Sequence, residues 1–452
     1  MSLPPRVLVD ESKSYMIYLY RDNYKTIEEL SEKEMRLAGL RINPKKNIGS
    51  RVSYYNNIEI SLIKNNKPEL LKVKGLPKNP RLSNIKWSPD QTMIAFTNTT
   101  SEGVELWVLD LEKVKLKKLT PPKLNANLGN VINWFKDSKS LLVKFVPPKT
   151  EAIKMTEDLV PSGPRISTND GAKAQNRTYQ DLLKNKNDEK NFEILALSEL
   201  YKVSIKGSKR LWKKRDMYRN INFSPDGRFV LITTIKRPFS YLVPYYRFPS
   251  TYTIYGSTGK QVAVLADIPL VEDLPKGFMS VRKGARSFSW RLDKPASIYF
   301  VSALDGGDPQ VESEFRDELF QIDAPFNADP SSLLKTKNRF YRSSWCNDTL
   351  AIVSDYWWNN RNAKTYLFNP SNPQDGSMIL SDRNYQDRYN DPGSFVKEKN
   401  NFGEDILTLR NNDLFLIGDG FTSNGQFPFL DKLDLSTMNK NRLYESNIED
   451  KK

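Results

Sequence analysis

A short unit recurs along this chain and constrains its fold more than any other feature of the sequence. Each copy has an aromatic residue, then a turn containing Asp or Asn, often with Pro or Gly, and then a short apolar strand. The copies begin at Trp87, Trp134, Phe223, Trp290 and Trp345. Proline presets φ in such turns, aspartate bonds back to the backbone, and glycine accepts a positive φ. Repetition of one supersecondary unit predicts a repeat architecture.

The apolar strands that follow the turns indicate how the units are arranged. Each strand is short and is bounded by turn residues, and a second strand such as Val104–Asp110 follows the first copy. A four-stranded sheet cannot bury both faces alone, but radial repetition buries the faces and leaves only short edges. We therefore predict an all-β fold, a β-propeller of four-stranded antiparallel blades. At the blade lengths implied by the spacing, 452 residues give about seven or eight blades.

The propeller is expected to span residues 1–446, followed by a tail at 447–452. The interval from Trp134 to Phe223 is longer than the others and corresponds to about two units. Residues 147–190 are rich in Pro, Lys, Asn and Asp, which predicts a long insertion between blades, either a functional loop or a linker. The few helices expected are one from Thr26 to about Leu37 and a short one at Tyr179–Lys184, the first with Thr26 as its cap.

The residue inventory excludes several chemistries. The chain has no histidine, so a Ser-His-Asp or Cys-His catalytic set cannot form, and no catalytic residue, metal site or cofactor is predicted. Its one cysteine, Cys346, precedes an apolar run and is interpreted as a packed core thiol. Ser257 lacks the glycine two positions earlier that a nucleophile elbow requires, so it is expected in a hairpin turn. Asp305–Asp308 is likewise interpreted as a turn and not as a calcium loop.

The net charge is +15, but lysine and arginine are scattered and often stand beside Asp or Glu. We therefore predict no nucleic acid partner. No apolar run is long enough to cross a bilayer, so no membrane association is expected. Residues 1–7 do not resemble a signal peptide. The compartment is therefore left open: periplasmic or secreted if a signal was removed, and otherwise cytoplasmic.

Six stretches in chain order resemble the glutamyl endopeptidases of bacteria and chloroplasts, a branch of the prolyl oligopeptidase family of serine peptidases. They are Ile27–Leu30 with Arg36–Pro44 and Arg51–Tyr55, Leu159–Pro164 with Arg177–Lys184, Arg237–Pro244 with Arg247–Pro249, Ser280–Ser287 with Trp290-Arg291 and Asp293–Pro295, Asp391–Ser394, and Pro428–Asp431. Each string alone is weak, whereas the ordered set covers nearly the whole chain and is specific.

The resemblance implies a two-domain peptidase in which a propeller caps an α/β-hydrolase domain. That domain would carry the Ser, Asp and His, and the propeller would restrict entry to a central chamber and help to select peptide substrates. The chain ends near the point where the hydrolase domain of the family begins, so the implied partner is a hydrolase domain of the same polypeptide. No family catalytic residue can be assigned to a position of this sequence.

Cleavage after glutamate requires a cation for the substrate carboxylate, and arginine binds carboxylates through two parallel hydrogen bonds. The arginines in the most family-like stretches are Arg237, Arg247, Arg282 and Arg286. We predict that one or more of them binds substrate. The alternative is structural: stacking on aromatic rings or pairing with acids between blades.

Two other functions remain open at this stage. A stand-alone propeller could bind a protein partner, because propellers host many unrelated functions. A sugar-processing propeller enzyme is disfavoured because no suitable pair of carboxylates is recognisable.

Overall fold

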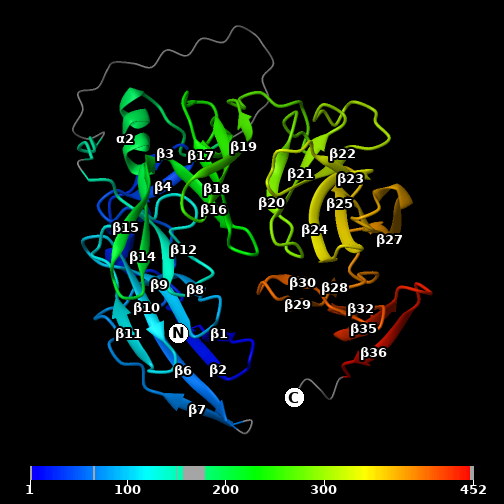
Figure 1. Cartoon of the computed structure of the whole chain (residues 1–452), viewed down its shortest axis with the longest axis horizontal. Coiled ribbons are helices and arrows are strands. Elements are labelled where there is room, and N and C mark those ends of the chain that lie inside the picture. Colours follow the sequence, from blue (N-terminus) through cyan, green and yellow to red (C-terminus); the bar gives the residue numbers. More distant parts are fainter. Residues whose placement is uncertain (1–2, 65–66, 149, 156–178, 448–452) are drawn as a thin grey trace. The chain divides into compact units, whose positions relative to one another are not determined.

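The computed structural model describes residues 3–64, 67–148, 150–155 and 179–447. Strands dominate it (Figure 1). The chain divides into two compact units, Met1–Phe223 with Phe229–Glu272, and Ser224–Arg228 with Asp273–Lys452. The predicted Leu159–Pro164 motif and most of the tail at 447–452 lie outside the described residues.

The first unit contains four four-stranded antiparallel sheets, here called blades 1 to 4. Blade 1 has the order β1 (Arg6–Val9), β2 (Tyr15–Tyr20), β6 (Asn57–Lys64), β7 (Lys67–Leu71). Blade 2 contains β8 (Leu82–Trp87), β9 (Met93–Thr99), β10 (Val104–Asp110) and β11 (Lys115–Lys118). Blade 3 contains β12 (Ile132–Trp134), β13 (Ser140–Phe145), β14 (Ser198–Ser204) and β15 (Lys209–Asp216). Blade 4 contains β16 (Tyr218–Phe223), β17 (Phe229–Ile235), β18 (Ser250–Gly256) and β19 (Gln261–Ile268).

The second unit contains three blades. Blade 5 contains β20 (Arg286–Trp290), β21 (Ser297–Ala303), β22 (Asp317–Asp323) and β23 (Ser331–Thr336). Blade 6 contains β24 (Arg339–Asn347), β25 (Leu350–Trp357), β26 (Asn362–Phe368) and β27 (Ser377–Asn384). Blade 7 has the order β28 (Ser394–Phe395), β32 (Asp413–Gly418), β35 (Phe429–Asp434), β36 (Lys440–Glu445), with β31 (Leu409–Arg410) also paired to β32.

Short sheets, helices and 3₁₀ turns lie outside the seven blades. Three short sheets are formed by β3 (Met35–Leu37), β4 (Leu40–Asn43) and β5 (Ile48–Gly49), by β29 (Lys397–Lys399) and β30 (Asp405–Leu407), and by β33 (Phe421–Thr422) and β34 (Gly425–Gln426). The helices are α1 (Ile27–Ser31) and α2 (Lys186–Ala196), with 3₁₀ turns η2 (Tyr245–Arg247) and η3 (Pro373–Asp375). Within the described ranges, no helix is long and apolar enough to cross a bilayer.

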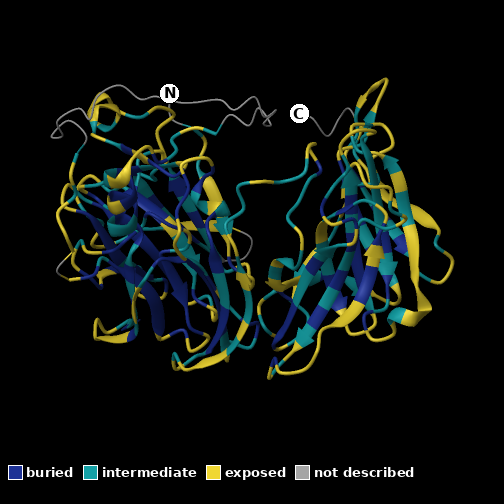
Figure 2. Cartoon of the chain, turned by 90° about the horizontal axis from the view of Figure 1, so that it is seen from above, coloured by how far each residue is buried: buried dark blue, intermediate teal, exposed yellow. Residues whose placement is uncertain are grey.

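Apolar clusters lie between consecutive blades of each unit. Ala95 and Leu106 of blade 2 pack with Ile132 and Val143 of blade 3, and similar clusters join the other neighbours. The buried residues accordingly follow the strands of each unit, whereas the connecting loops are largely exposed (Figure 2). Blades 2, 3 and 6 each pack against a neighbouring blade on both faces in this way. The predicted all-β propeller of four-stranded blades is confirmed, and the described residues form seven blades.

The repeating unit forms as its residue types predict. Each of the five aromatic residues ends, or nearly ends, the first strand of blades 2 to 6. In the first copy, Ser88 donates to Asp90 (Oγ–Oδ1, 2.6 Å), and Asp90 accepts from the Thr92 amide at 3.1 Å. Gln91 has a φ of +56°, while the equivalent position in blade 4 is Gly227, at +72°. These local bonds reverse the chain before tertiary contacts are needed.

The predicted helix from Thr26 to Leu37 is too long. Thr26 caps α1 as expected, with a reciprocal bond from Glu29, but the helix ends at Ser31. Met35 and Leu37 are buried on either side of an exposed Arg36, which is the period-two pattern of a strand. Their burial beside α2 in one apolar cluster therefore outweighs the local helix signal.

The predicted helix at Tyr179–Lys184 is absent, and α2 begins two residues later. Asp181 has a φ of +59°, which a right-handed helix does not accept. Its carboxylate instead binds Arg41 Nε at 2.7 Å. Asn185 caps α2 by accepting from the Asp188 amide, and Phe192 is buried against the blades.

The interval between Trp134 and Phe223 does not hold an additional blade. Trp134 ends β12 of blade 3 and Phe223 ends β16 of blade 4, so the two copies are consecutive. The extra length lies between β13 and β14, within blade 3 and not between blades as predicted. Composition reveals an insertion, but only strand pairing shows which two strands it connects.

Lys144, on β13, is buried where a propeller would usually place an apolar side chain. Its Nζ donates to the carbonyl oxygens of Leu128 and Tyr218, the latter at 2.7 Å, and the residue is 1% exposed. Burial lowers the pKa of Lys144 to about 7. The lysine thus joins blade 3 to blade 4 through backbone carbonyls.

Replacing Lys144 with methionine should change how stability depends on pH. Between pH 7 and pH 10.5 the unfolded state binds more protons than the folded state, so the lysine makes wild-type stability rise with pH in this window. The expected slope is about 1.4 kcal/mol per pH unit, and Lys144→Met should lose it. Chemical unfolding at several pH values measures the difference. Lys139→Met, at an exposed turn position, is the control, and equal slopes in wild type and Lys144→Met would refute this assignment.

Candidate functional site

Arg237, the first of the predicted substrate-binding arginines, lies just after β17 and contacts α2. Its Nη2 donates to Glu193 at 2.6 Å and its Nη1 to Glu189 at 3.2 Å. The guanidinium also lies 4.5 Å above the Phe239 ring. The hydrogen bond to Glu193 raises the pKa of Arg237 above its ordinary value. The side chain is nevertheless 48% exposed, so it is paired with acids and accessible at the same time.

Arg247 lies at the end of η2 and belongs to the same aromatic region. Its guanidinium lies 5.3 Å from the Tyr179 ring centroid. Phe239 and Phe248, which adjoin Arg237 and Arg247 in sequence, stack with their centroids 5.3 Å apart. The structure thus brings the first two arginines to one aromatic cluster.

Arg286, at the start of β20, belongs to a buried ion network of the second unit. It pairs with Asp317, which also accepts from Arg339 Nη1 at 3.1 Å. Arg339 donates through Nη2 to Asp305 at 2.7 Å, and Arg316 reaches the same carboxylate at 2.9 Å. Burial lowers the pKa of Arg286. Three guanidinium groups therefore surround two carboxylates, and the cluster keeps one excess positive charge.

Arg282 lies beside this network, near the predicted Asp305–Asp308 turn. Its Nη1 donates to the Lys283 carbonyl oxygen at 3.1 Å, and the neighbouring Val281 amide donates to the Gly307 carbonyl at 3.0 Å. The turn prediction is confirmed: the Gly307 amide bonds the Asp305 carboxylate at 3.0 Å. Although burial opposes it, hydrogen bonds from Arg339 and Arg316 lower the pKa of Asp305.

The ion network itself was not predicted. Asp305, Asp317 and Arg339 stand far apart in sequence, and their residue types are common on solvated surfaces. The one local signal is that Asp317 begins an alternating strand and lies on the same buried face as Leu319 and Gln321.

The two residues closest to a nucleophile have structural roles. Ser257 lies in the turn joining β18 to β19, where the Gly259 amide bonds the Gly256 carbonyl at 2.8 Å, so the hairpin prediction is confirmed. Cys346 is buried with its Sγ 3.5 Å from the Leu407 carbonyl oxygen, and burial raises its pKa to about 11. The thiol is therefore a core residue, as predicted. Among the described residues, no group of three His, Cys, Asp or Glu could hold a metal ion.

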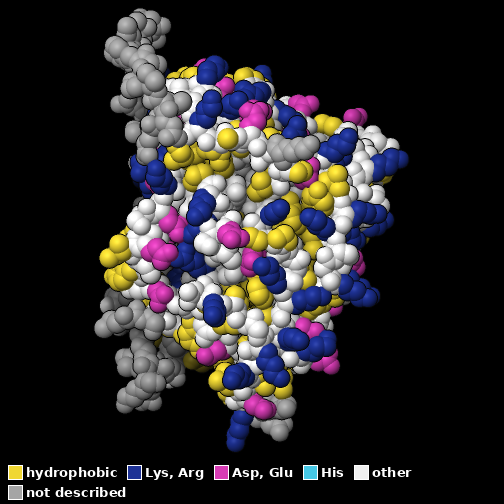
Figure 3. All heavy atoms as spheres, turned by 90° about the vertical axis from the view of Figure 1, so that its left-hand side faces the viewer, with side chains coloured by type: hydrophobic (Ala, Val, Ile, Leu, Met, Phe, Trp, Pro, Cys, Tyr) yellow, Lys and Arg dark blue, Asp and Glu magenta, His cyan; other side chains and the backbone are white. Residues whose placement is uncertain are grey.

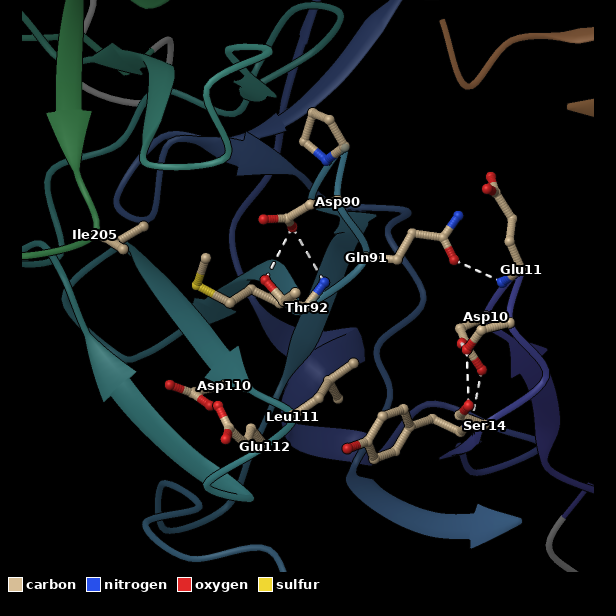
Figure 4. Close-up of a pocket in the computed structure, with 14 residues that line it drawn as sticks. Asp10, Glu11, Ser14, Asp90, Gln91, Thr92, Asp110, Leu111, Glu112 and Ile205 are labelled. Carbon is tan, nitrogen blue, oxygen red and sulfur yellow. Dashed lines mark hydrogen bonds between the residues drawn. The ribbon is translucent and has the colours of Figure 1, made fainter. Parts of the chain in front are cut away.

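A cavity of about 780 Å³ lies between the turns of blades 1 and 2 (Figure 4). Five acidic residues line it, and the carboxylates of three of them, Asp10, Asp90 and Asp110, bond the backbone of the turns. Asp10 accepts from the Tyr15 amide at 2.6 Å, and Asp110 accepts from the Lys113 amide at 2.9 Å. Burial alone would raise the pKa of Asp90, but hydrogen bonds from Ser88 and Thr92 outweigh this effect, so the pKa lies below its ordinary value. We assign no ligand to this cavity.

Surface charge is consistent with the scattered pattern of the sequence. On the face drawn in Figure 3, Lys and Arg side chains alternate with acidic and apolar ones and do not gather in a single patch. Phosphate-backbone binding usually relies on such a patch.

Two curated plant proteins are similar to this chain along almost its whole length. The chain is 34% identical over 465 residues to a probable glutamyl endopeptidase, chloroplastic, of Oryza sativa subsp. japonica, covering 98% of this chain and 49% of the relative. It is 32% identical to the protein of the same name from Arabidopsis thaliana, over 98% of this chain and 48% of the relative. The chain therefore spans about half the length of the curated relatives it matches. No family model matches it.

Solved structures are similar at low identity. The β-propeller domain of the Trilobed protease from Pyrococcus furiosus is 12% identical, with 99% of this chain and 98% of that chain covered and a TM-score of 0.39. The Pyrococcus horikoshii acylaminoacyl peptidase is 13% identical, with 100% and 54% covered and a TM-score of 0.41.

The blades define this chain as a β-propeller. Across 98% of its length it is homologous to proteins named probable glutamyl endopeptidase, as its ordered motifs predicted.

Proposed function

We propose that this chain is the non-catalytic, substrate-selecting and gating propeller of a serine peptidase that cleaves peptides after glutamate. The observation that carries the proposal is homology to glutamyl endopeptidases along the whole propeller, in a chain that contains no histidine. An α/β-hydrolase domain would supply the serine, aspartate and histidine. The propeller would restrict access to that domain and contribute cations for the substrate carboxylate.

Four arginines remain our candidates for that contact: Arg237, Arg247, Arg282 and Arg286. A structural role competes in each unit, because Arg237 pairs with two glutamates and Arg286 with Asp317. A guanidinium that pairs with protein acids at rest could exchange a glutamate of the protein for one of the substrate. The 48% exposure of Arg237 favours it over the buried Arg286 for such an exchange.

Alanine substitution tests the four arginines in the polypeptide that includes the hydrolase domain. For a residue that binds the substrate carboxylate, we expect KM for a peptide with glutamate before the scissile bond to rise roughly tenfold or more. The matched peptide with glutamine should change little. Arg210→Ala, at an exposed position of β15, is the control. Equal increases for both peptides would remove the residue from the site.

A second candidate function is the binding of a protein partner by a stand-alone propeller. The observation in its favour is the exposed apolar surface at α1, where Tyr24 is 83%, Ile27 86% and Leu30 70% exposed. Apolar side chains grouped in this way often mark an interaction surface. A G-x-S-x-G motif in the coding sequence downstream would favour the peptidase, and a stop codon would favour the partner-binding propeller.

A further inference from the structure

A groove lies between blades 6 and 7 in the second unit and has no part in the proposed selection of glutamate. It consists of two cavities of about 730 and 410 Å³. Both are lined by Arg342, Ser354, Thr365, Ser381 and Arg383, so the two cavities lie side by side. The family-like Pro392–Ser394 also lines both of them.

The floor of the groove is a row of polar residues that crosses all four strands of blade 6. Arg342 pairs with Ser354, Ser354 with Thr365, and Thr365 with Ser381. The Ser354 and Thr365 hydroxyl groups lie 3.3 Å apart. In the next row of the same face, Ile352 and Leu367 pack in an apolar cluster with leucines of blade 7. The two blades therefore close over the apolar row and leave the polar row half-buried.

The acidic residues at the groove already accept hydrogen bonds or pair with basic side chains of the protein. Asp355 accepts hydrogen bonds from the Asn338 amide and the Tyr366 hydroxyl, both at 2.8 Å. Asp382 pairs with Lys364, and Asp391 with Arg383 at 3.0 Å.

Three basic residues at the groove, in contrast, are not paired with acidic side chains in the described part of the chain. Arg342, Lys397 and Lys440 line it and form no ion pair within the described part of the chain. The groove consequently presents unbalanced positive charge, which complements an anionic ligand.

One wall of the groove is the edge of a sheet. Six consecutive residues of β27, Met378–Arg383, line the larger cavity. β27 is the last strand of blade 6 and, among the described strands, pairs with β26 alone. Its Met378 and Ile379 side chains are 47% and 48% exposed. An unpaired edge of this kind offers backbone N–H and C=O groups to an extended peptide.

The other end of the groove is aromatic. Tyr341, Tyr356 and Tyr385 line the smaller cavity. The Tyr356 ring contacts both others: its centroid lies 5.5 Å from that of Tyr341 and 6.1 Å from that of Tyr385. Tyr341 is 62% exposed. Tyrosines provide large contact area with few rotatable bonds, which suits peptide binding.

We propose that this groove binds an extended acidic peptide, which pairs with the free edge of β27 and places carboxylates beside Arg342, Lys397 and Lys440. The strand edge favours a peptide over a nucleic acid, because a polynucleotide has no backbone that completes a β-ladder. The binding does not depend on the proposed peptidase function.

The test is fluorescence anisotropy of the full chain with a labelled octapeptide of alternating glutamate and threonine. We expect saturable binding that weakens as salt increases. Arg342→Glu on blade 6 and Lys440→Glu on blade 7 should each weaken binding roughly tenfold or more. Arg210→Glu makes the same charge change at an exposed site of the first unit and should leave the affinity nearly unchanged. Circular dichroism verifies that each variant is folded.

Two modified peptides test separately how charge and strand pairing contribute to binding. The octapeptide with glutamine in place of glutamate should bind much more weakly, and one N-methylated at alternate residues should fail to pair with β27. The proposal is overturned by absence of binding to wild type, by equal binding of either modified peptide, or by an equal loss in Arg210→Glu. Binding of an eight-residue oligothymidine with the same sensitivity to Arg342→Glu would also overturn it. Because the readout is binding to this chain, its outcome is independent of peptidase activity.

Discussion

Replacing Arg339 with methionine is expected to reduce the free energy of unfolding by about 3–5 kcal/mol. Arg339 is 2% exposed and donates to Asp305, Asp317 and the Met279 carbonyl oxygen. Its loss leaves Asp305 paired with Arg316 alone and Asp317 paired with Arg286 alone, and removes a donor from the Met279 carbonyl. Truncation of one partner in a buried ion network costs far more than loss of a surface pair. The urea midpoint, followed by tryptophan fluorescence, measures the effect.

The control for this prediction lies on the same strand. Arg342 is an exposed residue of β24, so Arg342→Met should change stability by no more than about 0.5 kcal/mol. If Arg339→Met and Arg342→Met have equal urea midpoints, the buried network does not stabilise blades 5 and 6 as described.

Alanine at Gly307 is expected to destabilise the second unit by about 3 kcal/mol. Gly307 has a φ of +85°, and a Cβ atom there would lie 2.1 Å from the Val281 carbonyl oxygen. The clash is with backbone, and the Val281 amide is bonded to Gly307 at 3.0 Å, so neither segment can move freely. The substitution should also displace the Arg282 segment. Thermal unfolding detects the loss.

The neighbouring glycine provides a matched control. Gly306 also has a positive φ, +67°, but a Cβ atom there meets nothing within 4 Å. Gly306→Ala should therefore cost only the backbone strain of about 1 kcal/mol. Similar losses for the two variants would contradict the close approach of the turn to Val281.

The sequence predicted the blades because their signals are local. An aromatic residue, an aspartate turn and an apolar strand specify one hairpin, and blades 2 to 6 each repeat this unit. Blades 1 and 7 lack the repeated aromatic turn, and pairing in the structure reveals them. The sequence also misplaced the insertion between blades, because composition cannot show that β13 pairs with β14 across it.

The candidate site was less predictable because it depends on contacts between distant residues. The family-like stretches identified four arginines, but not that Arg237 contacts α2 or that Arg286 joins a network with Asp317. Similarly, alternation in β25 predicts that Ser354 and Tyr356 share a face. It does not predict that blade 7 leaves this face uncovered, because that depends on how two sheets pack.

The central claim is that this chain selects substrates for a hydrolase domain and does not cleave peptides itself. The most direct test is cleavage of a fluorogenic peptide with glutamate before the scissile bond. It compares this chain with the same chain extended by the coding sequence that follows it. The account predicts cleavage by the extended protein and none by this chain, which has no histidine. Cleavage by this chain alone would contradict the account, and so would the absence of cleavage by both proteins.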